Sequence, residues 1–570
     1  MGSRWIVAPG NREQAVELGA AVGLSPLSAQ LLINRGVINT ERARRYLEPR
    51  LADLRRPDGE QPMSGFDRAV GRLERALVDG ETVGVYGDYD VDGVTSCAVL
   101  SSFLRDAGGK ILPRVARRDA GYGFGVEDVQ AFFDGGCAVI VTCDLGTSDH
   151  EALAAARARN LDVIIVDHHQ VPDREPDALA LLNPHQPGCR FPFKGLASVG
   201  VAFYLAAALR TRLRARKYAR LPDSYDPRQL LDLVAIGTIA DMAPLTDENR
   251  ILVYAGLQRL KSNPRPGVAA LCAQAGLPEG VRRSADVGLR LSPRLNAPGR
   301  LGAAQLSLDL LLSEDPAQAA ELAQKCEDAN KKRQEVQERV MRDALADAEA
   351  LVRQQHEVLV LGGEGWAPGV VGIVAAKLVE RFARPAAVIA FDGDTGRGSL
   401  RSINGFDLHA ALKGCEDLLV RYGGHAAAAG LTVERKRLPE LRARLCAAAR
   451  AAMGSCDGQR EFKLDAELGL HEVDEPLATE LRRLEPFGIG NPEPLFGLRG
   501  VVLERTRIVG TGHLQVTLRD GDHARDGIGF NLAEGAPDSG SRVRAAFFPE
   551  LDTFRGVTRV RVRLRDLASE

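Results

Sequence analysis

The chain has 570 residues, which is too long for one hydrophobic core, because domains usually contain about 100–200 residues. We therefore expect about three or four domains. Hydrophobic residues make up 45% of the chain and charged residues 26%, which excludes global disorder. The net charge is only −2, so any contact with nucleic acid requires a local basic surface.

The nine cysteines are an odd number and include no Cys-x-x-Cys pair. This pattern indicates neither a disulfide framework nor a zinc ribbon, and it is typical of a reducing compartment, so we expect a cytoplasmic protein. The N-terminal sequence MGSRWIVAPGNREQ lacks the charged-then-apolar plan of a signal peptide, and no apolar run reaches transmembrane length. We therefore expect no membrane association.

The first half of the chain has the pattern of a parallel α/β domain. Residues 1–55 are predicted to be a helical lead-in, and residues 56–315 to be the first large domain. Within that domain, short Val- and Ile-rich runs alternate with amphipathic stretches and predict strands at Thr82–Tyr86, Ala138–Thr142 and Leu161–Val166. Each run ends at a polar cluster.

The second half divides into three further parts. Residues 316–355 are rich in Ala, Glu, Lys, Gln and Arg and predict a long solvated helix, a spacer of about 50 Å between two lobes. Residues 356–455 predict a second α/β unit with strands at Glu357–Leu361 and Ala386–Ala390 and a helical end near Arg450. Residues 456–570 contain short alternating strands that predict a small β-barrel, with loops at GDHARDG and GAPDSGS.

Three carboxylates at alternating positions follow the first predicted strand. Asp88, Asp90 and Asp92 lie in the segment GDYDVDG, between the strand and the next helix. Open α/β sheets place ligand sites at this end of their strands, and an acidic cluster there repels itself unless a cation is bound. The alternative, a solvated turn that caps a helix, explains one or two Asp residues better than three.

The next two strands end in the same way. The second runs into Asp144, and the third runs into Asp167, His168 and His169. A single His is more often structural than a ligand, but an Asp-His-His triplet offers oxygen and nitrogen ligands in one place. A fourth apolar segment, LLDLVAIGTIADMAPL, carries Asp241, for which a helix N-cap or a structural ion pair is an equally good explanation when it is taken alone.

These side chains predict a site for two divalent cations. Several carboxylates with one or two imidazoles and no thiolate suit Mn²⁺ or Mg²⁺ better than a closed zinc site. Two such ions roughly 4 Å apart form the usual clamp for phosphoester hydrolysis. Phosphoryl chemistry is therefore the predicted reaction class.

The four segments GDYDVDG, VTCDLG, VDHHQ and AIGTIADMAPL resemble, in order, the four motifs of the DHH phosphoesterase superfamily. The later segments SPRLNAPGRLG, GSLRSINGFDL, GGHAAAAG and EPFGIGNPEPLF resemble those of the bacterial RecJ-like exonucleases within it. The resemblance spans roughly residues 50–570. It implies a multidomain α/β fold, with a parallel-sheet DHH domain, a long connecting helix, an α/β DHHA1 domain and a C-terminal OB-type barrel.

The resemblance also implies an activity: 5′→3′ hydrolysis of single-stranded DNA to mononucleotides, in recombination and repair. By resemblance, two Mn²⁺ or Mg²⁺ ions are held by Asp88, Asp90, Asp92, Asp144, His168 and Asp241. His168, His169 and Asp144 are then the predicted catalytic residues, with Asp167 orienting the histidines. Asp144 is the favoured bridging ligand, although the sequence leaves this open.

A terminal 5′-phosphate requires Arg side chains, hydroxyls and backbone amides. The family-like segments supply Arg300, Ser399, Arg401 and Arg117, and the last of these has Arg118 as an alternative. Gly424 and His425 precede AAAAG and predict a Gly turn that opens an Ala helix, whose N-terminal amides bind a phosphate. Tyr122 is a candidate for base stacking. Each of these residues also has an ordinary explanation, as a surface charge, a helix cap or a core residue.

Two other functions remain open. Smaller DHH–DHHA1 enzymes hydrolyse short oligonucleotides or cyclic dinucleotides, and a replication-factor branch keeps the fold as a scaffold without metal ligands. The predicted barrel disfavours the first, and the complete ligand set disfavours the second. Family habit further suggests a monomer that works with a RecQ-type helicase and a single-stranded-DNA-binding protein.

Overall fold

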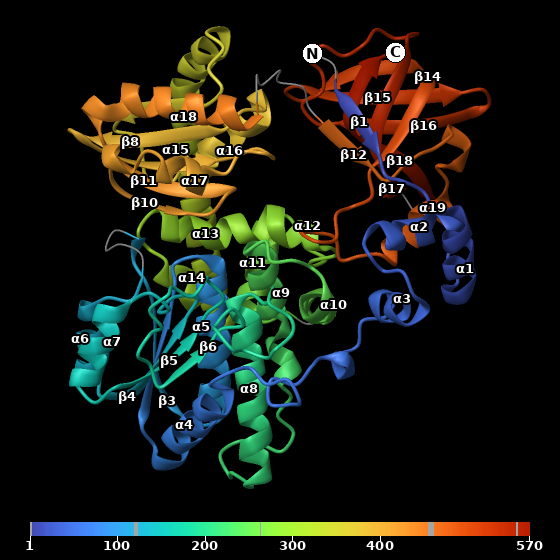
Figure 1. The fold of residues 1–570 in the computed structure, drawn as a ribbon. Coiled ribbons are helices and arrows are strands. Elements are labelled where there is room, and N and C mark those ends of the chain that lie inside the picture. The colour runs from blue at the N-terminus through green and yellow to red at the C-terminus, as the bar shows by residue number, and fades with distance from the viewer. Residues whose placement is uncertain (1–2, 119–122, 263, 454–460, 555–556) are drawn as a thin grey trace.

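The computed structural model describes residues 3–118, 123–262, 264–453, 461–554 and 557–570. These residues form three lobes, each with its own main sheet (Figure 1). Tyr122, one of the predicted substrate-binding residues, lies outside the described residues.

The first lobe is built on a five-stranded parallel sheet in the order β3-β2-β4-β5-β6. Its strands are β2 (Thr82–Gly87), β3 (Lys110–Val115), β4 (Cys137–Cys143), β5 (Asp162–Val166) and β6 (Ala180–Leu182). The three strands predicted from the sequence are β2, β4 and β5, which are direct neighbours. The predicted parallel α/β architecture is therefore confirmed.

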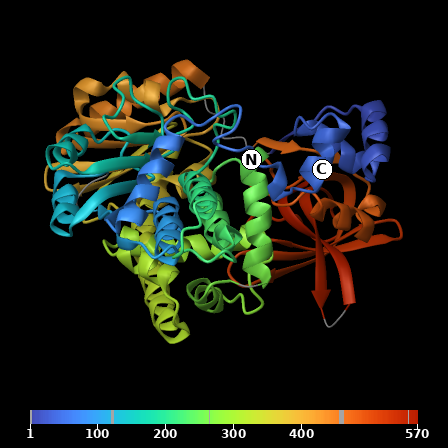
Figure 2. The same ribbon diagram turned by 90° about the horizontal axis from the view of Figure 1, so that it is seen from below.

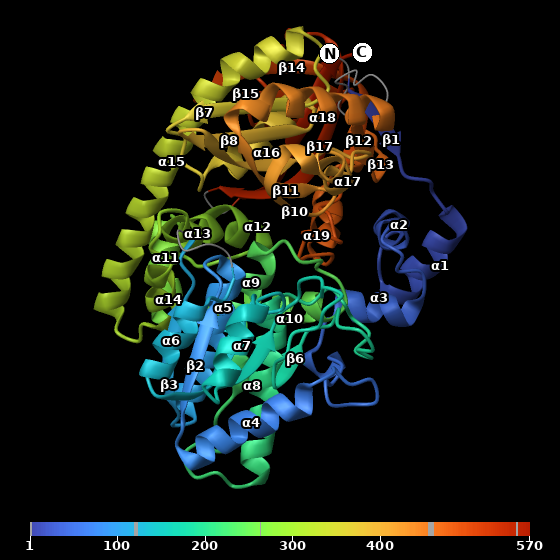
Figure 3. The ribbon, with the colours of Figure 1, turned by 60° about the vertical axis from the view of Figure 1, so that its left-hand side comes forward.

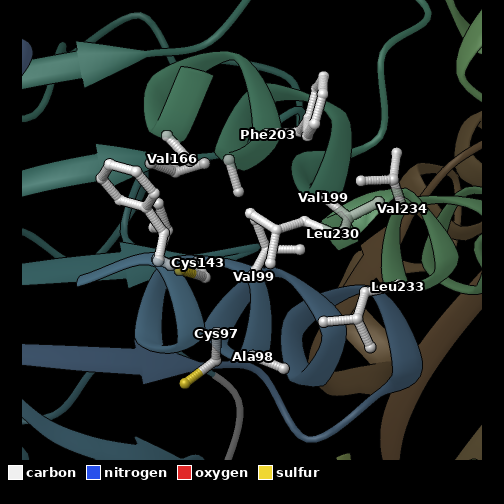
Figure 4. Close-up of a cluster of buried hydrophobic side chains, with 14 of the residues drawn as sticks. Cys97, Ala98, Val99, Cys143, Val166, Val199, Phe203, Leu230, Leu233 and Val234 are labelled. Carbon is white, nitrogen blue, oxygen red and sulfur yellow. The ribbon is translucent and has the colours of Figure 1, made fainter. Parts of the chain in front are cut away.

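Helices cover both faces of this sheet because its central strands are apolar on both sides. Along β4, Val139 and Cys143 lie in one buried cluster, and Ile140 lies in another. Figure 4 shows part of the first cluster, where Cys143 is gathered with Val199 and other side chains. The first face is covered by α4 (Phe66–Asp79), α5 (Val91–Asp106), α8 (Ser198–Ala215) and α9 (Leu231–Ala240), the second by α6 (Val126–Asp134) and α7 (His150–Ala158).

Further helices complete the first lobe and lead to the second. They are η1 (Leu51–Asp53), η3 (Pro227–Leu230), α10 (Asp247–Ser262), α11 (Pro266–Gln274), α12 (Ser284–Asp286), η4 (Val287–Leu291), α13 (Ser292–Arg300) and α14 (Gln305–Leu312).

The long helix α15 (Pro316–Arg353) confirms the predicted connecting helix, but it is not solvated on all sides. Ala323 and Cys326 lie in the core of the first lobe, whereas Val340 and Ala344 lie in the core of the second. Buried residues recur every three or four positions, so one face of the helix packs against both lobes along its length (Figure 3). The sequence prediction missed this face because many of its residues are small or polar.

The second lobe has a five-stranded sheet in the order β10-β11-β9-β8-β7. Helices α15 and α16 (Val371–Phe382) pack on one face, and α17 (Leu408–Lys413) and α18 (Leu438–Met453) on the other. The strands are β7 (Leu359–Glu364), β8 (Ala386–Asp392), β9 (Thr395–Arg401), β10 (Leu419–Gly424) and β11 (Ala428–Glu434), and the short helices are η5 (Glu416–Leu418) and η6 (Arg435–Arg437).

The predicted Ala helix after Gly424 is wrong, because this segment is the β10–β11 hairpin. Strand β11 lies between β10 and β9, and its residues Ala429, Leu431 and Val433 are buried at every second position. Pairing on both edges and burial of one face outweigh the helix propensity of the Ala run. Gly424 therefore does not open a helix.

The third lobe is a β-barrel, closed where β14 pairs with both β15 and β17. Its elements are β12 (Glu461–Leu464), β13 (Ala466–Glu467), η7 (Leu470–Glu472), α19 (Glu475–Arg482), β14 (Phe496–Val509), β15 (His513–Asp520), β16 (His523–Gly529), β17 (Arg542–Phe554) and β18 (Val557–Ser569). The barrel is as predicted.

The N-terminal segment belongs spatially to the barrel (Figure 2). Strand β1 (Arg4–Val7) pairs in parallel with β12, and it is followed by α1 (Arg12–Val22), α2 (Pro26–Asn34) and α3 (Thr40–Leu47). Leu18, Leu31 and Leu32 are buried in the barrel cluster. Among the described residues, no single helix is long and apolar enough to span a membrane; only α1 and α2 together, bent by 107°, pass that test by length and composition.

Candidate metal centre

The first acidic motif lies at the junction of β2 and α5. Asp90 is the N-cap of α5, and its Oδ1 accepts the amides of Asp92 and Gly93 at 2.9 and 3.1 Å. A Cβ on Gly93 would lie 2.4 Å from the Asp88 nitrogen, so only glycine allows the helix to start this close to the strand. This junction holds Asp88, Asp90 and Asp92 side by side.

The second and third motifs continue the hydrogen-bond ladder of the sheet. The amide of Asp88 donates to the Cys143 carbonyl at 3.0 Å, and the amide of Asp144 donates to the Val166 carbonyl at 2.8 Å. Asp144 has a left-handed backbone with φ 66°, a conformation that Asp tolerates better than most residues. Because the strands are parallel, the side chains that follow β2, β4 and β5 meet at one edge.

Asp167 organises the histidine motif. Its Oδ1 accepts the amides of His168 and His169 at 2.7 and 3.2 Å and lies 2.7 Å from His169 Nδ1. Although burial opposes the shift, the hydrogen bond with His169 lowers the pKa of Asp167 to about 2. In turn, Asp167 overcomes the effect of burial and raises the pKa of His169 to about 9.

His168 links the second and fourth motifs. Its Nε2 lies 3.3 Å from Asp144 Oδ1, and its Nδ1 lies 3.8 Å from Asp241 Oδ2. Asp241 caps the C-terminal end of α9, the apolar helix that packs in the core of the first lobe. The helix thus carries this carboxylate to the edge of the sheet.

The six predicted metal ligands divide into two groups of three. Ligand atoms of Asp88, Asp90 and Asp144 lie within 4.8 Å of one another, and so do those of Asp92, His168 and Asp241. Asp144 and His168 also form a third such group with His169, so the two sets are in contact. This spacing suits two neighbouring cations.

The electrostatics of the cluster also favour bound divalent cations. Burial and the charge of Asp90 raise the pKa of Asp88 to about 8, and burial and the charge of Asp92 raise that of Asp241 to about 7. Burial, followed by the charge of Asp90, also raises the pKa of Asp144 well above its usual range. Asp88 Oδ1 is buried and has no hydrogen-bond partner among the described residues. Divalent cations would satisfy these oxygens and relieve the repulsion.

The predicted phosphate-binding residues gather where the first two lobes meet. Arg300, at the end of α13, donates from Nη1 to the Gly369 carbonyl at 3.0 Å. Arg401 lies on β9 and donates to Ser399 Oγ at 3.0 Å. A Cβ on Gly372, in the first turn of α16, would lie 2.9 Å from Ser399 Oγ and 3.2 Å from Arg401 Nη2. The two side chains therefore lie against the N-terminal turn of α16.

The other substrate candidates differ in their exposure and contacts. Arg117 is exposed, whereas the guanidinium of Arg118 lies 4.6 Å from the ring centroid of Tyr89, between the first two acids. This position favours Arg118, the alternative that the sequence left open. His425 is exposed in the β10–β11 turn, where its amide donates to the Ala428 carbonyl at 2.8 Å.

Two residues of the centre escaped the sequence analysis. Ser198, at the start of α8, donates its hydroxyl to Asp144 Oδ1 at 3.0 Å and its amide to Asp92 Oδ2 at 2.8 Å. Thr147 donates its hydroxyl to Asp167 Oδ2 at 2.5 Å. The available signal was a hydroxyl residue at a predicted helix start, a feature too common to single out Ser198.

Three family models match successive parts of the chain. The DHH family N-terminal domain matches residues 82–238, the DHHA1 domain matches residues 355–451, and the RecJ OB domain matches residues 464–566. The first match contains the acids that follow β2, β4 and β5, and the second contains Ser399 and Arg401.

Curated relatives and solved structures agree with these matches. The single-stranded-DNA-specific exonuclease RecJ of Salmonella typhimurium is 36% identical over 97% of both chains. RecJ of Bacillus subtilis is 38% identical over 93% of this chain and 66% of its own length. The crystal structure of Thermus thermophilus RecJ in complex with Mn²⁺ covers all of this chain and 80% of that one, with a TM-score of 0.84 and 32% identity. This chain therefore belongs to the RecJ family of single-stranded-DNA-specific exonucleases.

Proposed function

We propose that this protein is a metal-dependent hydrolase that degrades single-stranded DNA from its 5′ end and releases 5′-mononucleotides. The observation that carries the proposal is the pair of ligand triplets, each within 4.8 Å, beside half-buried arginines at the junction of two lobes. Asp88, Asp90 and Asp144 would hold one Mn²⁺ or Mg²⁺ ion, and Asp92, His168 and Asp241 the other. Such ions supply charge stabilisation and a lowered pKa for the attacking water.

The protein's own groups have complementary tasks. Asp167 fixes the proton of His169 on Nδ1, so Nε2 is the ring nitrogen that would donate to a phosphate oxygen once it is protonated. Ser198 holds Asp144 in place through its hydroxyl group. Asp92 accepts two amides from the start of α8, which fixes its carboxylate between that helix and α5.

The arginine side supports recognition of the 5′ end. Arg401, Ser399 and the first turn of α16 lie together as a polar group suited to a terminal phosphate, and Arg300 interacts electrostatically with Asp90 and Arg401. Arg118 belongs to the same charged region. His425 and Gly424, whose predicted helix is absent, are weaker candidates for this surface.

The cellular setting is a further proposal. We place the protein in the cytoplasm, as a monomer acting in DNA recombination and repair beside a RecQ-type helicase and a single-stranded-DNA-binding protein. We also propose five structural parts, at residues 1–55, 56–315, 316–355, 356–455 and 456–570. Packing of the first part on the barrel suggests that these two parts move together.

The test is digestion of single-stranded DNA labelled at either end, with and without a 5′-phosphate, in Mn²⁺. Wild-type protein should release mononucleotides from the 5′ end, and Asp144→Ala should be inactive. Asp173→Ala, which removes an exposed Asp of the same lobe, should remain active. If wild-type protein leaves the polymer intact but hydrolyses short oligonucleotides or cyclic dinucleotides, the substrate assignment is wrong. If it binds no Mn²⁺ and hydrolyses none of these substrates, the protein is a scaffold and not an enzyme.

A further inference from the structure

The buried face of α15 changes character along its length. Towards the N-terminus it is formed by Ala323 and Cys326, in the core of the first lobe, and from Val340 onward it lies in the core of the second. Between these two sections the buried residues are polar: Glu327, Asn330, Arg333 and Gln337. The polar section therefore lies where the helix passes from one lobe to the other.

Arg333 is the cation of this section, and it has only neutral partners. It donates from Nη1 to Gln337 Oε1 and from Nη2 to Asn330 Oδ1, both at 2.7 Å. Its Nε is buried without a hydrogen-bond partner among the described residues, and no carboxylate within the described chain forms an ion pair with it. Glu327, six residues earlier in the helix, is instead paired with Arg294 at 2.6 Å.

Arg333 also belongs to a group of cations. Burial, followed by the nearby charges of Arg118 and Arg333, lowers the pKa of Arg300 to about 10. Arg401 contributes to the same shift, and burial lowers its own pKa as well. Arg333 is buried, whereas Arg300 and Arg401 are half-buried. Like charges gathered away from water are unfavourable unless an anion compensates them. Among the described residues, neither Arg300 nor Arg401 has a carboxylate ion pair.

We propose that the polar section of α15 is part of the substrate site, and that Arg333 binds a phosphate oxygen of the nucleic-acid strand between the two lobes. Asn330 and Gln337 are positioning residues, because they hold the two Nη groups and so fix the plane of the guanidinium. The long helix thus has a binding role in addition to spacing the lobes. This inference rests on the proposed function, since it takes the anion from the DNA substrate.

The test compares Arg333→Gln with Arg339→Gln, which removes the same charge from the exposed side of the same helix. Binding of fluorescent single strands is measured in EDTA over a range of salt concentrations, so that no hydrolysis occurs. Loss of one phosphate contact should lower the slope of log K against log salt by about 0.7 and weaken binding roughly tenfold or more. With Mn²⁺, KM should rise in Arg333→Gln while kcat changes little.

Two further variants separate binding from folding. Arg333→Lys keeps the charge but not the planar fork, so it should retain the salt slope and raise KM. Asn330→Ala should likewise raise KM and leave kcat and the slope unchanged. The inference is overturned if Arg333→Gln behaves as Arg339→Gln does, or if it lowers only the melting temperature while the salt slope of the folded protein stays that of wild type.

The source of the phosphate is resolved by comparing 5′-phosphorylated with 5′-hydroxyl strands. A defect confined to the phosphorylated strand assigns Arg333 to the terminal phosphate, and an equal defect on both assigns it to an internal one. The proposed function fails separately, if wild-type protein does not degrade single strands at all.

Discussion

Replacing Asp88 with Asn should stabilise the metal-free protein, and should do so increasingly as the pH rises. Asp88 is 2% exposed, and its pKa rises from 3.8 to about 8 in the folded state through burial and the charge of Asp90. Between these two values the folded state binds a proton that the unfolded state has released, so stability falls as pH rises. One such group contributes a slope of at most about 1.4 kcal/mol per pH unit. Asn removes this slope.

The assay is urea unfolding of EDTA-treated protein at several pH values from about 5 to about 7.5, with Asp173→Asn as an exposed control. Urea is uncharged and does not screen the cluster, as guanidinium salts would. The gap in unfolding free energy between Asp88→Asn and wild type should widen with pH, while the Asp173→Asn curve follows wild type. A gap that is constant with pH, or a variant less stable than wild type throughout, would refute the assignment of mutual repulsion.

Adding Mn²⁺ should make wild type more stable than Asp88→Asn. A ligand that binds only the folded state stabilises it by about 2.7 kcal/mol at a hundred times its Kd. Wild type gains this stabilisation with its carboxylates ionised, and Asp88→Asn gains less because one oxygen ligand of the first triplet has lost its charge. Equal gains in the two proteins would remove Asp88 from the set of metal ligands.

Three other substitutions follow from the geometry. Asp167→Asn should lower kcat about 10–100-fold, because it weakens the hydrogen bond that orients His169, and unchanged kcat in a steady-state assay would contradict that role. Gly424→Ala should destabilise the protein by about 1–3 kcal/mol, because φ is 133° and the new Cβ would lie 2.5 Å from a backbone oxygen. Gly423→Ala, with nothing within 4 Å, is its control in thermal unfolding, and equal effects would refute the hairpin geometry. Asn491→Ala should cost about 1–3 kcal/mol in the same assay, since this fully buried amide donates to two carbonyls, and a smaller loss would show that water replaces it.

The grouping of acids and histidines in the candidate metal centre could be predicted from the sequence because its parts are encoded locally. Apolar runs define strands β2, β4 and β5, and each run is followed directly by acids or histidines. Parallel strands bring their carboxyl ends to one edge, so the order of residues along the chain already places Asp88, Asp144 and His168 together. Alternating apolar patterns likewise predicted the second α/β unit and the barrel, and composition predicted the long helix.

Features that depend on contacts between distant segments could not be predicted in this way. The Ala run after Gly424 favours a helix locally, and only pairing with β9 and β10 makes it a strand. The residues of β1 pair with β12, more than four hundred positions later, and no local pattern specifies that pairing. Arg333 is one of many charges on a long helix, and its buried position is visible only once both lobes are packed against α15.

The sequence by itself therefore determined most element types, the Ala run after Gly424 excepted, and the chemistry at the ends of the strands, since both depend mainly on neighbouring residues. Only the tertiary structure decided which face of α15 is buried and how the N-terminal strand meets the barrel. It also decided which arginines at the lobe junction lack a carboxylate ion pair within the described part of the chain. These features depend on burial and on pairing between distant segments. The free energy of that burial and pairing exceeds the local propensity of the Ala run for a helix, so the run is a strand.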